Sequence, residues 1–290
     1  MPPTATGPFI QRKPWVSDES MDTTGETLRA DGERRWFEVQ RDSDAYGGVD
    51  DQSMFCGSDA LCFPHRVPVE FRLRALTRMP PEVARLRDNL SKLSDARVAA
   101  LGQLLPSLLC GEESAFLVFW RDGQEVSNAQ ASRSRALAYR IAADELAHEH
   151  LLQQLRSCCP VAGDIASILP GTRRFFLRIA SRDPAVHFAR VAGLDSGLCV
   201  ILAALVKPLS RVTALTEIFD RIRRDEARHV IFSRQRSYEL GAGTLLVANT
   251  AAQIRGELVS LLYPLGRSFE DIGVDSDHLF RRIKAQKSLA

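Results

Sequence analysis

Apolar residues recur at helical spacing through most of the chain after residue 90. Residues three, four and seven positions apart share one face of a helix, so this spacing predicts helices that each bury one face. Long helices are expected at residues 94–120, 128–157, 184–206, 212–240 and 245–263. A shorter helix is expected at 173–182, and Pro106 is expected to kink the first long helix. Asp183 and Pro184 fit a helix start, and Gly241 fits a helix end.

The first part of the chain has a different character. Residues 1–62 are rich in Gly, Asp, Ser and Thr and show no helical periodicity. We therefore expect an irregular N-terminal extension at 1–66 and one helical domain at 67–290. Within that domain a long connection, residues 158–183, separates the second long helix from the third. One long crossover of this kind is found in four-helix bundles, so the expected fold is all-α, a four-helix bundle with extra helices.

The composition narrows the classes of partner. The net charge is +2 with 26% charged residues, which gives no reason to expect a nucleic acid or a membrane as partner. The longest apolar run, 198–206, is shorter than the roughly 18 residues of a membrane span. The six cysteines show no zinc-type CxxC pairing, and the N-terminus has no apolar signal-peptide core. We therefore expect reduced thiols and a cytoplasmic protein.

The motif Asp-Glu-x-x-His occurs twice, on the second and fourth long helices. Its residues are Asp144, Glu145 and His148 in one copy and Asp225, Glu226 and His229 in the other. Residues i and i+3 lie about 60° apart on a helix, so each Glu and His can reach the same point. A lone copy is usually part of a solvated face. Two copies on apolar stripes indicate a shared metal site, because an unpaired buried charge is costly.

A dinuclear site of this kind also takes one carboxylate from each of the other two helices. Asp195 is the only acidic residue of the third long helix, and an ion pair with Arg190 is the alternative role for it. The first helix offers two adjacent candidates, Glu112 and Glu113. We prefer Glu112, which is in phase with Leu105, and keep Glu113 as the alternative.

With these residues the chain resembles the ferritin-like di-iron carboxylate superfamily over roughly half of its length. This superfamily includes ribonucleotide reductase small subunits, bacterial multicomponent monooxygenases, rubrerythrins and arylamine N-oxygenases. The resemblance implies a ferritin-like bundle in which Asp225 bonds His148 and Asp144 bonds His229. The run Asp-Glu-Ala-Arg-His is also similar to the arylamine N-oxygenases, which have an additional histidine where this chain has Ile222.

The expected metal ligands are Glu112 (or Glu113), Glu145, His148, Asp195, Glu226 and His229, with Asp144 and Asp225 behind the histidines. Carboxylates and imidazoles suit two iron ions, with manganese as an alternative. We expect an oxidoreductase, a di-iron oxygenase that uses O₂ to hydroxylate, N-oxygenate or desaturate a small organic or carrier-bound substrate. Its electrons would come from an external donor, and a homodimer is compatible with the sequence. The alternatives are an iron- or manganese-binding storage or peroxide-detoxifying protein, and a helical interaction protein with an incidental metal site.

Two glycines and three polar residues near the motifs have their own expected roles. Gly193 and Gly197 lie inside the third long helix, where each costs about 1 kcal/mol relative to alanine. They predict either a pocket beside the metals or close packing of two helices. Glu149, His150 and His187 are expected to serve packing or to lie at the surface.

Overall fold

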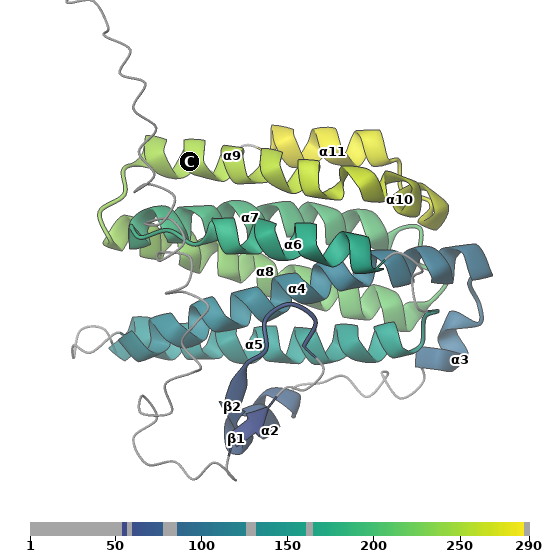
Figure 1. Cartoon of the computed structure of the whole chain (residues 1–290), viewed down its shortest axis with the longest axis horizontal. Coiled ribbons are helices and arrows are strands. Elements are labelled where there is room, and N and C mark those ends of the chain that lie inside the picture. Colours follow the sequence, from purple (N-terminus) through teal and green to yellow (C-terminus); the bar gives the residue numbers. More distant parts are fainter. Residues whose placement is uncertain (1–53, 57–59, 78–85, 126–131, 161–164, 287–290) are drawn as a thin grey trace, which may run out of the picture.

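The centre of the structure is built from two pairs of consecutive long helices (Figure 1). The computed structural model describes residues 54–56, 60–77, 86–125, 132–160 and 165–286. In the first pair α4 (Asp95–Glu125) packs along α5 (Ser132–Ser157), and in the second α7 (Pro184–Val206) packs along α8 (Thr213–Glu239). The described residues are mainly helical, so the all-α class is confirmed.

The connection between the two pairs contains α6 (Ile165–Ile179), which packs on α4. This helix begins earlier than the one expected at 173–182 and has Pro170 inside it. A proline in a helix removes one intrahelical hydrogen bond. Pro170 is exposed and lies in the second turn, and the helix continues through it. Pro106 is likewise contained within a continuous α4.

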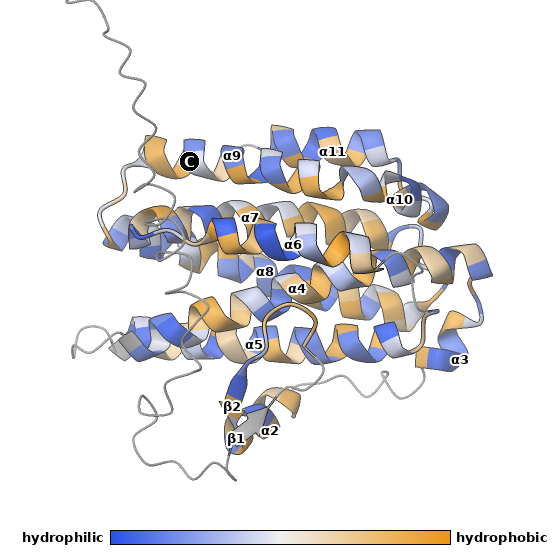
Figure 2. Ribbon diagram, viewed as in Figure 1, coloured by the Kyte–Doolittle hydropathy of each residue, from blue (hydrophilic) through white to orange (hydrophobic). Residues whose placement is uncertain are grey.

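A second layer of helices covers α7 and one end of α4. α9 (Thr244–Leu262) lies along α7, and α11 (Ser276–Ala285) contacts both of them. Between them, η5 (Tyr263–Leu265) and α10 (Gly266–Ile272) turn the chain against α4. α11 buries Leu279, Phe280 and Ile283, and Figure 2 shows the polar residues that alternate with them.

The helix α7 is the core helix of the second pair. The Asp183 side chain caps it by accepting hydrogen bonds from the backbone N–H groups of Ala185 and Val186, as the sequence predicts. By length and composition α7 could also cross a membrane, with a mean hydropathy of 1.8, but 61% of its apolar window is buried inside the protein. Its apolar character is therefore explained by burial on most sides.

Glycines allow α9 to approach α7 closely. A Cβ atom on Gly193 would lie 2.7 Å from the Cα of Ala251, and one on Gly197 would lie 2.6 Å from a methyl group of Leu258. Of the two roles considered for these glycines, close helix packing is the one that the structure shows.

The N-terminal part of the described chain is a small β-hairpin followed by two short helices. β1 (Met54–Cys56) pairs antiparallel with β2 (Arg66–Pro68). After it, α2 (Val69–Leu76) packs against α5, and α3 (Leu86–Leu90) contacts α8.

The segment 60–68, which we call the strap, belongs to the folded core. Cys62, Phe63, His65 and Val67 of the strap are all buried. The boundary expected between residues 66 and 67 therefore divides a folded hairpin, while residues 1–53 of the expected extension lie outside the described residues.

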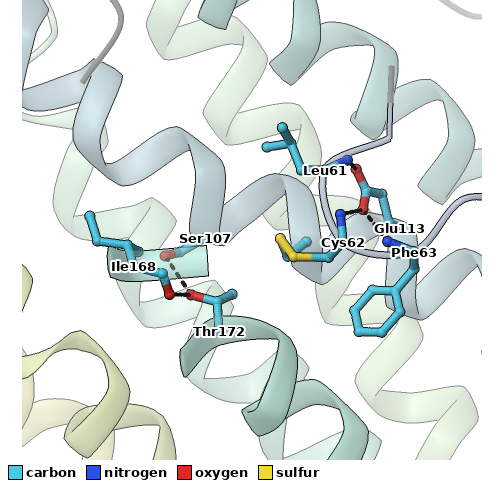
Figure 3. Close-up of a disulfide and its surroundings, with 8 residues drawn as sticks. Leu61, Cys62, Phe63, Ser107, Glu113, Ile168 and Thr172 are labelled. Atoms are coloured by element: carbon cyan, nitrogen blue, oxygen red, sulfur yellow. Dashed lines mark hydrogen bonds between the residues drawn. A yellow bond between two sulfur atoms is a disulfide. The ribbon is translucent and has the colours of Figure 1, made fainter. Parts of the chain in front are cut away.

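A disulfide bond fastens the strap to α4 (Figure 3). It joins Cys62 to Cys110, which are 48 residues apart in sequence and 5.4 Å apart between their Cα atoms. The expectation that all the cysteines are reduced thiols is therefore wrong for this pair. The reason is that the strap folds back onto α4, a long-range contact for which the local sequence has no signal. Cys158, Cys159 and Cys199 are free thiols.

Candidate metal centre

Carboxylates and histidines from three helices meet in the interior. Glu112 of α4, Glu145 and His148 of α5 and Glu226 of α8 each place one ligand atom within 4.8 Å of the others, and all four are buried. His229 of α8 adjoins them, with its Nδ1 atom 2.9 Å from Glu145 Oε1 and 3.5 Å from Glu226 Oε1. We call these five residues, together with Asp195, the cluster.

Helical spacing aims each glutamate and its histidine at the same point. His148 Nδ1 lies 3.6 Å from Glu145, three residues before it, and also 3.3 Å from Glu112 and 3.5 Å from Glu226. Both histidines therefore present Nδ1, and not Nε2, to the carboxylates.

The outer nitrogen of each histidine faces the aspartate of the other motif. His148 Nε2 lies 3.1 Å from Asp225 Oδ2, and His229 Nε2 lies 3.8 Å from Asp144 Oδ2. A carboxylate can only accept, so Nε2 of His148 donates to Asp225, while Nδ1 faces the carboxylates of the cluster and would give up its proton to a bound cation. Of the two crossed hydrogen bonds that the resemblance implies, the one between Asp225 and His148 is formed, whereas Asp144 and His229 face each other beyond hydrogen-bond distance.

Asp195 approaches the cluster from α7. It is 2% exposed, and it lines the same cavity as Glu112, Glu145 and Glu226. The alternative ion pair with Arg190 is not formed, because that guanidinium donates to the carbonyl oxygens of Arg178 and Ala180. The Oδ2 atom of Asp195 has no hydrogen-bond partner within the described residues.

Glu113 has a different role from its neighbour Glu112. Its carboxylate accepts three backbone N–H hydrogen bonds from the strap, from Leu61 at 2.6 Å, Cys62 at 2.8 Å and Phe63 at 2.9 Å (Figure 3). Both of its oxygens are used in this way. The structure therefore brings Glu112 to the cluster and places Glu113 against the strap.

Burial and neighbouring charges shift the pKa values of the cluster. Burial raises the pKa of Glu112 and of Asp195, and nearby carboxylates raise them further. Burial opposes ionisation of Glu145 too, but the adjacent His229 and His148 outweigh it and lower the pKa. For both histidines burial alone would lower the pKa, whereas the surrounding carboxylates raise it well above its usual value. The cluster therefore retains protons in the absence of another cation, and a metal ion would displace them.

Several buried polar atoms of the cluster form no hydrogen bond within the described residues. They are both carboxylate oxygens of Glu145, Asp195 Oδ2, Glu226 Oε1 and both ring nitrogens of His229. His229 Nδ1 and Glu145 Oε1 are close but are not aligned as donor and acceptor. An unsatisfied buried polar atom costs about 1–3 kcal/mol, so a cation that accepts several of these lone pairs would stabilise the arrangement. The donor set thus fits a metal site.

An apolar cavity adjoins the cluster on the side of α6 and α9. Glu112, Glu145, Asp195 and Glu226 form its polar end. Its walls are mainly apolar side chains, from Leu108, Ala115, Phe176, Leu194, Leu198, Ile201, Leu258, Leu261 and Leu262. The remaining polar side chain, Ser107, is already within 3.3 Å of the Thr172 hydroxyl (Figure 3). No basic residue lines the cavity in the part of the chain that the structure describes.

One buried pair beside the cluster has no signal in the sequence. His65 of the strap lies 3.2 Å from Glu149, the residue after His148, and its ring packs on Phe116. Glu149 therefore has a packing role, as expected, but its partner comes from a segment with no recognisable motif. His187 is also buried, near the carbonyl oxygen of Ile179, and burial lowers its pKa to about 4.

Comparisons of the chain with protein-family models, with curated proteins and with solved structures found no match. The class of protein is therefore defined by the fold and the site themselves. It is an all-α protein with a buried carboxylate and histidine cluster that could hold a metal ion.

Proposed function

We propose that this chain is a ferritin-like di-iron oxygenase. The observation that carries the proposal is the convergence of two Glu-x-x-His motifs whose Nδ1 and carboxylate atoms face one another, several of them without a hydrogen-bond partner among the described residues. The paired helices α4–α5 and α7–α8 with α6 in the crossover support the bundle topology.

The proposed ligands are Glu112, Glu145, His148, Asp195, Glu226 and His229. Four carboxylates would balance the charge of two divalent ions, and oxygen with imidazole nitrogen ligands suits Fe(II), with Mn(II) as the competitor. When bound, a pair of iron ions supplies an O₂-binding site and two of the electrons that O₂ reduction needs.

The rest of the site would position the ligands and exclude water. Asp225 would accept a hydrogen bond from Nε2 of His148 and fix the orientation of that ring, and Asp144 faces Nε2 of His229 at 3.8 Å. The apolar walls of the cavity would keep water from the polar end and would bind an uncharged, mainly apolar group of the substrate there. This cavity favours an oxygenase over a protein that only stores metal ions, which has no need of an apolar pocket beside them.

Oxygen uptake tests the proposal. Iron-loaded protein with a chemical reductant should consume O₂, and a panel of small apolar compounds should raise the rate and yield oxygenated products. A change of His229→Ala should abolish the uptake, whereas the matched change His150→Ala, on the partly exposed face of α5, should leave it intact. Full uptake by the His229→Ala protein, or uptake that no compound on the panel couples to product, would overturn the oxygenase assignment.

A further inference from the structure

An arginine-lined hollow lies on the outer side of α5 and α8. Arg140 of α5 and Arg221, Arg224 and Arg228 of α8 surround it, and Asp144 and Asp225 complete its lining. The three arginines of α8 recur at spacings of three and four residues and therefore share one face of the helix. We call this feature the arginine hollow.

The arginine hollow has a surplus of positive charge. Arg140 and Arg221 form no ion pair with any residue that the structure describes, and Arg224 shares Asp220 with Arg223. Arg228 alone engages the two aspartates of the hollow, and its side chain is still 53% exposed. Because both aspartates also face histidines on their inner side, they compensate the four guanidinium groups only in part.

The arginine hollow is also the short connection between solvent and the cluster. Asp225 belongs to its lining, and the Oδ2 atom of that residue lies 3.1 Å from Nε2 of His148. The opposite ring nitrogen of His148 faces the cluster carboxylates at 3.3–3.6 Å. One carboxylate and one imidazole therefore separate the hollow from the proposed metal ions. On the other sides, within the described residues, α6 and α9 flank the apolar cavity, and the strap and α2 pack against α4 and α5.

We propose that the arginine hollow is the docking surface for an acidic electron-donor protein. The proposal rests on the proposed function, in which electrons must enter from outside the chain. Two donor molecules would each lose one electron, and two Fe(III) ions would become two Fe(II), which balances the exchange. Arg140, Arg224 and Arg228 are exposed and Arg221 is partly exposed, and guanidinium groups spread in this way over two helices fit the carboxylate side chains of a protein surface. A site for a small oxyanion would instead be expected to offer buried N–H donors that lack a partner. Within the described residues, none of the four arginines of the hollow has a buried side-chain atom of this kind.

Binding to the metal-free chain is the first test, and it needs no metal chemistry. The probe is a strongly acidic [2Fe–2S] ferredoxin, titrated at low ionic strength. We expect Arg140→Gln with Arg221→Gln to weaken its binding by about tenfold or more, and added salt to weaken binding to the unchanged chain. The matched control, Arg173→Gln with Arg174→Gln, removes the same charge from exposed positions on α6 and should bind as the unchanged chain does.

Electron transfer to the iron-loaded chain is the second test. Oxidation of the reduced ferredoxin, followed by stopped flow, should slow by about tenfold or more in the Arg140→Gln, Arg221→Gln protein. Reduction by a small uncharged or cationic reductant should keep its rate, which shows that the site itself is intact. Equal losses in the α6 control, ferredoxin binding that ignores salt, or no binding at all would each overturn the docking surface. A chain that binds ferredoxin at the hollow but takes up no iron would instead refute the proposed function.

Discussion

The adjacent residues Glu112 and Glu113 should respond in opposite ways to the same chemical change. Each is buried, and replacing either glutamate by glutamine removes one negative charge and little volume. Glu112 faces the cluster, so Glu112→Gln should weaken metal binding. It should leave the metal-free fold as stable as before or more stable, because it removes a buried carboxylate from a group that is rich in them.

Glu113→Gln should instead destabilise the fold. The carboxylate of Glu113 accepts three backbone N–H groups, and a glutamine amide would present an N–H₂ group to one of these donors. Losing one hydrogen bond to a charged acceptor and weakening the others amounts to roughly 2–4 kcal/mol, allowing for the carboxylate desolvation that is relieved. In a chain of this size that loss should lower Tm by about 3–7 °C.

Thermal unfolding of both metal-free variants, with metal analysis after loading, separates the two roles. We expect Glu113→Gln to lose Tm and to keep its metal content, and Glu112→Gln to do the reverse. If Glu113→Gln instead lost metal with an unchanged Tm, the assignment of the two neighbours would be reversed and the strap contacts would not be those of the native protein.

Three other perturbations test the electrostatics, the disulfide and the helix packing. The histidines of the cluster have raised pKa values, so their contribution to stability is complete below about pH 6.5 and is lost as the pH rises through those raised values. The Tm of metal-free protein should therefore fall as the pH is raised above about 6.5, whereas the Tm of metal-loaded protein should change little. Reduction of the disulfide, or its replacement by two serines, should lower the free energy of unfolding by up to about 4 kcal/mol, because the bond closes a loop of 48 residues. Denaturant unfolding with and without reductant measures this difference. Gly193→Ala should lower the free energy of unfolding by about 1–3 kcal/mol, because its Cβ would meet the backbone of Ala251. The control Gly256→Ala, with open space around the new Cβ, should be neutral or stabilising. Equal effects of the two changes would argue against the α7–α9 contact.

Local signals in the sequence were sufficient for the helices that carry the cluster. The start of α7 follows from Asp183 and Pro184, and the end of α8 is marked by Gly241, whose φ of 98° suits a glycine. The helix α11 was missed although Asp275 caps it, because its apolar pattern covers too few turns to stand out. The strap contacts could not be predicted, since they join segments about 50 residues apart that share no motif.

The part of the candidate site that depends only on the spacing of residues along one helix could be predicted from the sequence. Spacing of three residues brought Glu145 to His148 and Glu226 to His229, and this required no tertiary information. The choice between Glu112 and Glu113 needed more, because adjacent residues point about 100° apart and only the position of the neighbouring helix decides which one faces the cluster. The arginine hollow depends on two helices that are far apart in sequence, and so it became visible only in the structure.

Anaerobic loading of the chain with Fe(II), followed by metal analysis and Mössbauer spectroscopy, tests the central proposal most directly. We expect about two iron ions per chain, as the paired motif requires. The spectrum should be that of high-spin Fe(II), and limited exposure to O₂ should convert it to a coupled di-ferric one. His148→Ala should lose this signal, and His187→Ala, at a buried position outside the cluster, should keep it. One iron ion or fewer per chain, with the spectrum of an isolated ion, would contradict the proposal.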